Sequence, residues 1–311
     1  MSKILITGGA GYIGSVLVPE LLKEEHEVTV LDNFMYGQTS FFDLCHKKEL
    51  TIVRGDARNR ELVKKQMEDK EIIIPLACIV GVPACNKDEV AARTTNLDAI
   101  RLILEMRNPS QKIIFPNTNS GYGIGEKDVY CDEATPLRPI SLYGKTKVEA
   151  EEAILKSGNA ITFRLATVFG MSPRMRLDLL VNQFVYEAFT KKYIILFEAH
   201  FKRNFIHIRD VARAFVHAIK NFERMKGEPY NVGLSDANLS KKELCEEIKK
   251  QIPNFYVVEA EVGEDPDKRN YIVSNAKIER TGFQPSVSLQ AGISELIKGY
   301  AILKNNKFTN E

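Results

Sequence analysis

A short apolar segment that runs directly into a glycine-rich turn constrains this chain more than any other feature. Residues 3–7 form a short run with an apolar, partly β-branched centre, residues 8–14 contain four glycines, and apolar residues recur at helical spacing over 16–22. Gly8 can adopt the positive φ of a tight turn because it lacks a Cβ. A glycine cluster alone is as typical of a plain turn as of a dinucleotide-binding site. A strand, a glycine turn and a helix in this order, however, predict a dinucleotide-binding site. The diphosphate would lie against free N–H groups at the helix N-terminus.

The pattern of the next hundred residues predicts a parallel sheet. Further strands are expected over residues 26–31, 51–54, 72–78 and 112–115, with helices over 61–67 and 89–106. The run at 72–78 is too uniformly apolar for a half-exposed strand and is typical of a sheet covered on both faces. Strands that alternate with helices predict an α/β fold, a doubly wound parallel sheet of the Rossmann type.

Charge and composition exclude several classes of function for these 311 residues. The net charge of +2 offers no basic stripe, so neither nucleic acid nor a membrane is expected as a partner. The longest uncharged run, residues 72–86, is too short to span a bilayer. Met1 leads almost directly into the first strand, which predicts no signal peptide and a cytoplasmic protein. The five cysteines and five histidines lack disulfide or metal-ligand spacing, so no metal is expected.

Acidic residues at two strand ends indicate which dinucleotide binds. Asp32 and Asn33 follow the second strand, about 20 residues after the glycine turn, where a carboxylate binds the hydroxyls of an adenosine ribose. Because Asp32 would repel a 2′-phosphate, NAD is expected rather than NADP; the alternative is that Asp32 only caps a turn. Asp56, next to Ala57, could accept the adenine amino group or instead serve as a helix N-cap.

Tyr143 and Lys147 are the strongest candidates for chemistry. They are i and i+4 in a segment expected to be helical, so both lie on one face. Tyrosine, with an ordinary pKa of about 10, is a poor base at neutral pH, but a nearby ammonium and an oxidised nicotinamide would both stabilise its phenolate. Tyr143 is therefore expected to take a proton from a substrate alcohol, while Thr118 hydrogen-bonds the reacting oxygen. The alternative is a Y-x-x-x-K pair on a solvated helix face.

Together these motifs resemble the extended short-chain dehydrogenases/reductases over nearly the whole chain. The resemblance rests on T-G-x-x-G-x-x-G at 7–14 and on Asp32, Gly55, Asp56, Asn96, Thr118, Tyr143 and Lys147. It implies a Rossmann domain over 1–175 with 204–233 returning to it, a smaller C-terminal α/β domain over 176–203 and 234–311 that binds a nucleotide-linked sugar, and a homodimer. The implied NAD-contacting residues are Gly8, Gly11, Tyr12, Ile13, Gly14, Asp32, Asn33, Asp56, Ala57, Leu76, Ala77, Asn96, Tyr143 and Lys147.

The second half of the chain resembles the substrate-binding part of the same family. Residues 161–170 match the form R-x-x-N-V-Y-G-P, except that Thr167 replaces an asparagine that often meets the substrate diphosphate, and Met171 replaces the proline. Arg203 matches an arginine that holds sugar-nucleotide phosphates, with a surface ion pair as the alternative. Arginine forks suit phosphate oxygens, and the implied substrate-binding residues are Asn119, Ser120, Thr167, Arg174, Arg176, Asn182, Arg203 and Arg269.

The residues after Thr118 narrow the reaction. Family members that dehydrate the sugar carry Asp-Glu directly after this threonine, and those that decarboxylate it usually have a glutamate there. Asn119 and Ser120 cannot act as a carboxylate acid or base, so neither reaction is expected. Oxidation and epimerisation at C4 both remain open, because no residue type in the sequence separates them.

Three stretches resemble one branch of the family, the enzymes that oxidise C4 of GDP-D-glycero-α-D-manno-heptose in bacterial capsule synthesis: residues 116–127, 164–176 and 263–269. This resemblance implies a nucleotide-diphosphate sugar substrate, GDP-linked, and a second oxidant such as a small keto acid if the reduced cofactor stays bound. The first alternative is a UDP-hexose 4-epimerase. The remote one is a non-catalytic sensor of NAD or a sugar nucleotide, against which the intact Thr118, Tyr143 and Lys147 argue.

Overall fold

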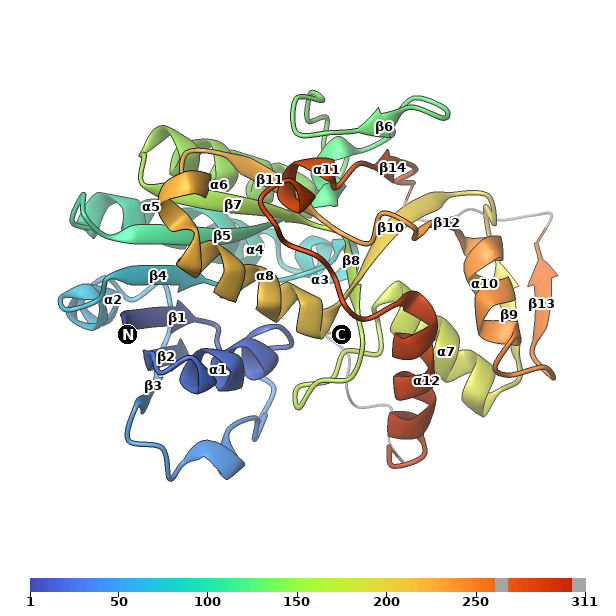
Figure 1. The fold of residues 1–311 in the computed structure, drawn as a ribbon, viewed down its shortest axis with the longest axis horizontal. Coiled ribbons are helices and arrows are strands. Elements are labelled where there is room, and N and C mark those ends of the chain that lie inside the picture. The colour runs from blue at the N-terminus through green and yellow to red at the C-terminus, as the bar shows by residue number, and fades with distance from the viewer. Residues whose placement is uncertain (261–267, 304–311) are drawn as a thin grey trace.

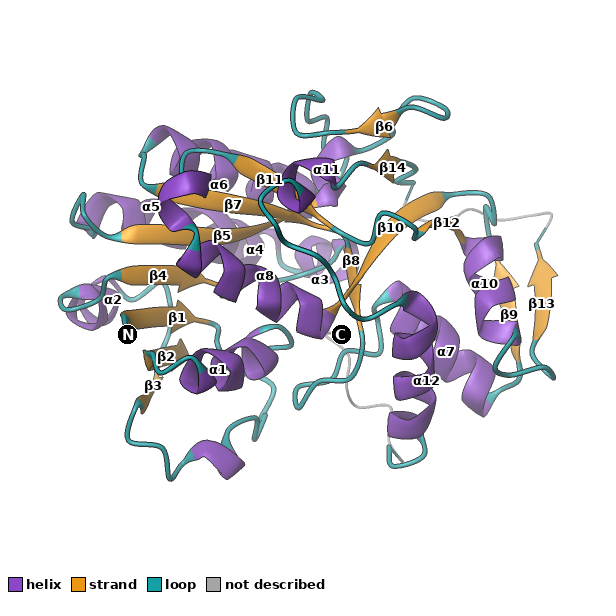
Figure 2. Cartoon of the chain, viewed as in Figure 1, coloured by secondary structure: helices purple, strands orange, loops and turns teal. Residues whose placement is uncertain are grey.

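A parallel sheet with helices on both faces forms the larger part of the molecule. The computed structural model describes residues 1–260 and 268–303, so most of the stretch 263–269 and the end of the expected domain 234–311 lie outside the described residues. The strands of the main sheet are β1 (Lys3–Thr7), β2 (Glu27–Asp32), β3 (Leu50–Arg54), β4 (Ile72–Pro75), β5 (Lys112–Thr118), β7 (Ala160–Leu165) and β11 (Pro229–Val232). Their order is β11-β7-β5-β4-β1-β2-β3 with every neighbouring pair parallel (Figure 1 and Figure 2), which confirms the predicted Rossmann-type α/β fold.

Both faces of the main sheet are buried under helices. The covering helices are α1 (Gly14–Lys23) and α8 (Ile208–Lys220) on one face, and α2 (Arg60–Met67), α5 (Ala99–Met106) and α6 (Leu142–Lys156) on the other. On β1, Ile4 and Ile6 enter the core with α1 and α8, whereas Leu5 enters the core on the opposite face. Two buried faces explain why the central strands β1 and β4 are almost wholly apolar, whereas the edge strand β3 is partly exposed.

Shorter strands and further helices lie beyond the carboxyl ends of the main strands (Figure 1). They are β6 (Tyr130–Cys131), β8 (Thr167–Phe169), β9 (Tyr193–Leu196), β10 (Lys202–His207), β12 (Asn238–Ser240), β13 (Tyr256–Glu259) and β14 (Ile272–Val273), with α7 (Leu180–Thr190), α10 (Lys241–Lys249) and α12 (Leu289–Tyr300). Two short helices lie elsewhere: α9 (Phe222–Met225) is at the amino ends of the main strands, where Glu223 pairs with Lys112 of β5, and α11 (Ala276–Glu279) packs beside β11. Strands β8, β10 and β12 form one small sheet, and β9–β13 and β6–β14 form two pairs. Within 204–233, β10 lies in the small sheet, while α8 packs on α1 and β11 joins the main sheet.

Between β4 and β5 the chain departs from the predicted elements. The strand expected over 72–78 ends at Pro75, which has no N–H for a further ladder bond, and α3 (Val82–Lys87) follows. The helix expected over 89–106 is α4 (Glu89–Arg93), a π-helical turn (Thr94–Asp98) and α5. The wider turn aims the Asn96 amide at the backbone of the preceding loop, and such π turns are frequent at functional sites.

The part of the chain that the structure describes contains neither a long apolar helix nor a metal-ligand cluster. No helix there is long and apolar enough to cross a membrane. No group of three or more His, Cys, Asp or Glu side chains there could hold a metal ion.

An ionic cluster fixes the last described helix, α12, to the loop after β8. Glu295 of α12 accepts the N–H of Met171 at 3.1 Å, lies 3.4 Å from Nε2 of His207, and forms an ion pair with Arg209. Burial opposes the charge on Glu295, but His207, Met171 and Arg209 more than offset this effect and hold its pKa at about 2. The ionised carboxylate therefore stabilises the folded state.

We expect the Glu295→Gln variant to lose less stability on acidification than the wild type. Because the folded pKa lies below the ordinary value of 4.5, the stabilisation is present above that value and is lost as the pH falls toward 2. Urea unfolding at about pH 7 and about pH 3 should show a loss smaller by on the order of 1–2 kcal/mol in the variant. Glu246→Gln, at an exposed position on α10, is the control and should follow the wild type. Equal losses in all three proteins would contradict the role of Glu295.

Candidate active site

A cleft at the carboxyl edge of the main sheet collects most of the predicted site residues. One wall is formed by the ends of β1, β2, β4 and β5 and by α6, and the other by the segment 165–180, α7 and β9. Open α/β sheets bind ligands at this edge, where the strand order reverses, here between β1 and β4. The predicted residues that line the cleft are Gly8, Gly11, Tyr12, Ile13, Gly14, Asp32, Asn33, Asp56, Ala57, Leu76, Ala77, Thr118, Ser120, Tyr143, Lys147, Thr167, Arg174, Arg176, Arg203 and Arg269.

The glycine turn has a shape that fits a dinucleotide. Gly8 has a φ of +69°, and a Cβ added to it would lie 2.5 Å from the backbone of Ala77. A Cβ added to Gly14 would lie 2.2 Å from the carbonyl oxygen of Gly9, so α1 begins in direct backbone contact with the turn. A side chain at either glycine would displace the turn, and its backbone N–H groups would then no longer be placed to bind a diphosphate.

Asp32 ties the end of β2 to this turn. Its Oδ2 accepts the N–H of Ala10 at 2.9 Å, and its Oδ1 accepts the N–H of Phe34 at 2.8 Å. Burial raises the pKa of the carboxyl group, while these two N–H groups oppose the rise. Asp32 therefore caps the turn and also lines the cleft, where its carboxylate can accept a ribose hydroxyl.

Asp56 and Asn96 serve the cleft in different ways. Asp56 lines it and pairs with Arg58 at 2.6 Å, whereas the N-cap of α2 is Asn59. Asn96 is buried and does not line the cleft; its amide bonds to the N–H and the carbonyl oxygen of Ile79 at 2.8 and 2.9 Å. Asn96 thus holds in place the loop after β4, which itself lines the cleft.

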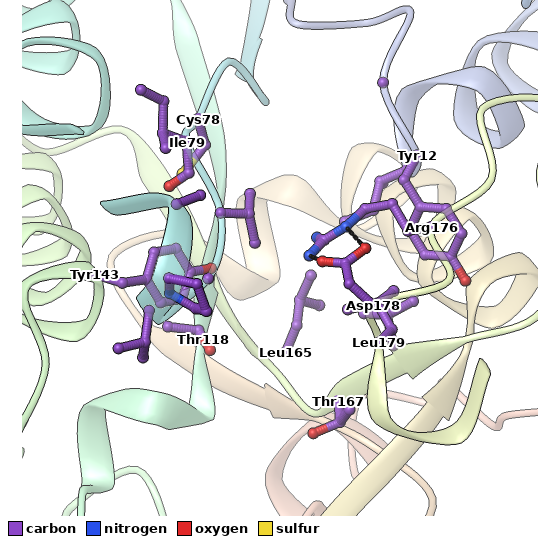
Figure 3. Close-up of a pocket in the computed structure, with 18 of the residues that line it drawn as sticks. Tyr12, Cys78, Ile79, Thr118, Tyr143, Leu165, Thr167, Arg176, Asp178 and Leu179 are labelled. Atoms are coloured by element: carbon purple, nitrogen blue, oxygen red, sulfur yellow. Dashed lines mark hydrogen bonds and ion pairs between the residues drawn. The ribbon is translucent and has the colours of Figure 1, made fainter. Parts of the chain in front are cut away.

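The three predicted catalytic residues come from two elements and share one wall. Thr118 is the last residue of β5, and Tyr143 and Lys147 lie one turn apart on α6. Figure 3 shows Thr118 and Tyr143 beside each other at this wall. Ser141 caps α6 by accepting the N–H of Gly144 at 3.1 Å, so Tyr143 lies in a well-defined first turn.

Burial and nearby cations set the proton affinities of this group. Burial raises the pKa of Tyr143, and the charges of Arg176 and Arg269 act to lower it. Burial lowers the pKa of Lys147, whose Nζ lies 3.8 Å from the centre of the Phe115 ring. The net effect in the free protein is a raised pKa of Tyr143, and a cationic ligand bound beside it would lower that pKa, as a catalytic base requires.

Of the two residues after Thr118, Ser120 faces the cleft and Asn119 is buried away from it. The Ser120 hydroxyl oxygen lies 2.9 Å from that of Thr118, and Arg269 donates a hydrogen bond to the same Ser120 hydroxyl. Asn119 is 1% exposed and does not line the cleft, and among the described residues its amide has no hydrogen-bond partner. Of these two residues, Ser120 is the one that can meet a ligand in the cleft.

Arginines and tyrosines meet around the opposite wall. The guanidinium carbon of Arg174 lies 4.1 Å from the ring centre of Tyr36, and that of Arg203 lies 5.5 Å from the ring centre of Tyr271. Such cation–π contacts hold a guanidinium group against the flat face of a ring. Thr167, at the start of β8, lines the cleft from the same side.

Asn182 is fully buried and holds this wall together from behind. Its Oδ1 accepts the N–H of Gly170 at 3.0 Å, and its Nδ2 donates to the carbonyl oxygen of Arg176 at 2.8 Å and to the Tyr12 hydroxyl at 3.1 Å. Asn182 therefore fixes the segment 170–176 against the glycine turn and does not itself line the cleft.

Sequence reasoning missed Tyr36 and Asp178, although both line the cleft. Asp178 forms an ion pair with Arg176. Their separation of only two residues was a usable signal, because an arginine and an aspartate so close along the chain can form an ion pair. For Tyr36 no such signal exists, since the path of the loop after β2 follows no sequence period.

Comparison with known proteins identifies the family. The model of the "NAD dependent epimerase/dehydratase family" matches residues 4–233. The chain belongs to this family. Its cofactor is accordingly NAD, as the glycine turn and Asp32 predicted.

Individual relatives cover nearly the whole chain. A protein of Bacillus subtilis (strain 168) described as an uncharacterized UDP-glucose epimerase is 29% identical over 95% of this chain and 96% of its own length. The crystal structure of UDP-glucuronic acid 4-epimerase from Bacillus cereus, in complex with UDP-glucuronic acid and NAD, is 26% identical with a TM-score of 0.83 and covers 96% of this chain and 99% of its own. The UDP-glucose 4-epimerase of Thermotoga maritima, solved with UDP-glucose, shares the fold at 22% identity, with a TM-score of 0.84 over 96% of this chain and 99% of its own.

We expect Gly8→Ala to weaken NAD binding by at least about tenfold, whereas Gly37→Ala should leave it unchanged. Both glycines have positive φ, so both variants carry a backbone strain of about 1 kcal/mol. A Cβ at Gly37 meets nothing within 4 Å among the described residues, whereas one at Gly8 overlaps the backbone of Ala77. Calorimetric titration with NAD separates steric damage to the site from strain alone. Equal NAD affinity in the two variants would contradict the proposed site.

Proposed function

We propose that this chain oxidises the C4 carbinol of a nucleotide-activated sugar. The observation that carries the proposal is the convergence of Thr118, Tyr143 and Lys147 on the cleft that also contains the glycine turn and Asp32. When bound there, NAD supplies the acceptor for the hydride. Membership of the NAD dependent epimerase/dehydratase family supports the same class of reaction.

Three side chains handle the proton. Tyr143 takes it from the carbinol hydroxyl, and the ammonium of Lys147, on the same face of α6, stabilises the resulting phenolate. Thr118 hydrogen-bonds the carbinol oxygen, with its own hydroxyl oriented by Ser120 at 2.9 Å. Thr118 and Tyr143 are labelled in Figure 3, and Lys147 and Ser120 line the same cleft.

Arg203 and Arg269 support a substrate that carries a diphosphate. Arg203 is only 3% exposed yet lines the cleft, and it rests on Tyr271. Arg269 reaches the catalytic wall through its bond to Ser120. A buried arginine directed at a cleft is typical of a phosphate contact, because the guanidinium fork matches phosphate oxygens.

Dehydration and decarboxylation suit this site poorly. In the family, both reactions use a carboxylate directly after the threonine, where this chain has a buried amide at Asn119 and a hydroxyl at Ser120. The carboxylate of Asp178 is on the opposite wall and is paired with Arg176. We therefore place the chain among the enzymes that oxidise C4 without elimination.

Our first assignment is the oxidation of GDP-D-glycero-α-D-manno-heptose to its 4-keto derivative for capsule or surface polysaccharide. The resemblance of residues 116–127 and 164–176 to that branch supports it. A UDP-hexose 4-epimerase is the second candidate, and the relatives described as UDP-sugar epimerases favour it. The two differ in whether the 4-keto sugar leaves the site or is reduced again on its other face.

The mass of the product distinguishes these two assignments. Incubation with GDP-heptose should give a product lighter by two hydrogens, whereas a 4-epimerase should convert UDP-galactose into an isomer of the same mass and a new retention time. If the reduced cofactor stays bound, oxidation should stop after about one turnover per site until a small keto acid such as pyruvate is added. Continued turnover with free NAD alone would remove the need for the keto acid.

Tyr143→Phe should lower kcat by about 10²–10⁴-fold and leave NAD affinity unchanged, because only the proton acceptor is removed. Single-turnover kinetics with the substrate found above, together with NAD titration, measure both quantities. Tyr130→Phe, an exposed tyrosine on β6, is the matched control and should behave as wild type. If Tyr143→Phe kept full activity, Tyr143 would not be the base. If the protein bound NAD and sugar nucleotide but neither form catalysed a reaction, the non-catalytic sensor would be favoured.

A further inference from the structure

The cleft contains a second polar pair that the proposed reaction does not use. Nε of Arg176 donates to one carboxylate oxygen of Asp178 at 3.1 Å, and Nη2 donates to the other, so the contact is bidentate. Side-chain exposure is only 9% for Arg176 and 23% for Asp178, and both residues line the cleft. Figure 3 shows this pair across the cleft from Thr118 and Tyr143.

The wall that carries the pair does not depend on it for its position. The Tyr12 hydroxyl donates to the carbonyl oxygen of Gly170 at 2.7 Å, and Ser172 donates to the carbonyl oxygen of Tyr12 at 2.8 Å. Asn182 adds its bonds to Gly170 and Arg176. Since a buried ion pair is a poor source of stability once desolvation is counted, this pair is better explained by a ligand in the cleft.

The chemistry of the pair suits sugar hydroxyls. A carboxylate has lone pairs for two neighbouring hydroxyl groups in addition to its bonds from a guanidinium. Within the described residues, Asp178 engages Nε and Nη2 of Arg176, and no hydrogen bond of Nη1 is found there, so its N–H groups are available to a ligand oxygen. A phosphate group is disfavoured at this pair, because the negative charge of Asp178 offsets the positive charge of the Arg176 guanidinium.

We propose that Arg176 and Asp178 bind hydroxyl groups of the sugar ring and thereby turn its C4 carbinol toward Tyr143. This inference rests on the proposed function, and it moves Arg176 from the phosphate contact expected from the sequence to a contact with the sugar. Arg203 and Arg269 remain the phosphate contacts. The two roles then lie at different points along one bound sugar nucleotide.

The test compares ligands with and without the sugar. Binding of GDP-mannose against GDP, and of UDP-glucose against UDP, is measured by calorimetry on the NAD-loaded protein. Asp178→Asn should weaken binding of the sugar nucleotide by about 10- to 100-fold and that of the nucleoside diphosphate by less than about twofold, as expected for lost bonds to a charged group. Arg203→Gln should weaken both members of each pair to a similar extent.

A second variant guards against a fold defect. Arg176→Met combined with Asp178→Asn removes both charges without leaving one buried and unpaired, and it should show the same selective loss with NAD affinity unchanged. Equal weakening of sugar nucleotide and nucleoside diphosphate in both variants would overturn the inference and leave the proposed function intact. If wild-type protein bound none of the four ligands, the proposed function would fail and this inference with it.

Discussion

The buried carboxylate of Glu151 is the interaction on which the catalytic geometry depends. It accepts the side-chain amide of Asn117 at 2.7 Å and forms an ion pair with Arg164 at 2.8 Å. Asn117 directly precedes Thr118, and Glu151 lies one helical turn beyond Lys147, so one carboxylate joins the end of β5 to the catalytic helix. Glu151 and Arg164 are 2% and 7% exposed, and removal of one partner from such a pair costs about 3–5 kcal/mol.

The same network continues to the opposite wall of the cleft. Arg164 donates to the Tyr122 hydroxyl at 3.2 Å, and the Tyr122 ring packs edge-on against Tyr271 with centroids 6.2 Å apart. Tyr271 in turn lies under Arg203. The proton-transfer wall and the arginine that we assign to the phosphate are therefore linked through buried contacts. Such a linkage favours a substrate of defined length between its reacting carbon and its diphosphate.

The sequence predicted those parts of the structure that depend on local repetition. Five strands of the main sheet follow from short apolar runs, the glycine turn from the absence of a Cβ, and the Tyr143–Lys147 face from the helical period of 3.6 residues, and the structure contains all of them. The π turn around Asn96 gives no such signal, because its residues continue the pattern of an ordinary α-helix in the sequence. Burial of Asn119 and Asn182 was equally out of reach, since an amide at a loop or helix start can face either the cleft or the core. Arg176 was found by residue type, whereas the role of its near neighbour Asp178 in the cleft was recognised only from the structure.

This contrast explains why cofactor and substrate are specified so unequally. The glycine turn binds through backbone atoms, and its shape is set by contacts such as Gly8 against Ala77 that no other residue could make. In the opposite wall, the segment 170–176 is irregular chain held by Asn182 and Tyr12, and its side chains can change while these hydrogen bonds remain. Relatives with the same fold can therefore share NAD binding, and the chemistry that we propose for Tyr143, yet differ in the sugar that they accept. A carboxylate such as Asp178, placed across from the base that we propose, is the kind of difference that would select one sugar over another without altering the proposed reaction at C4.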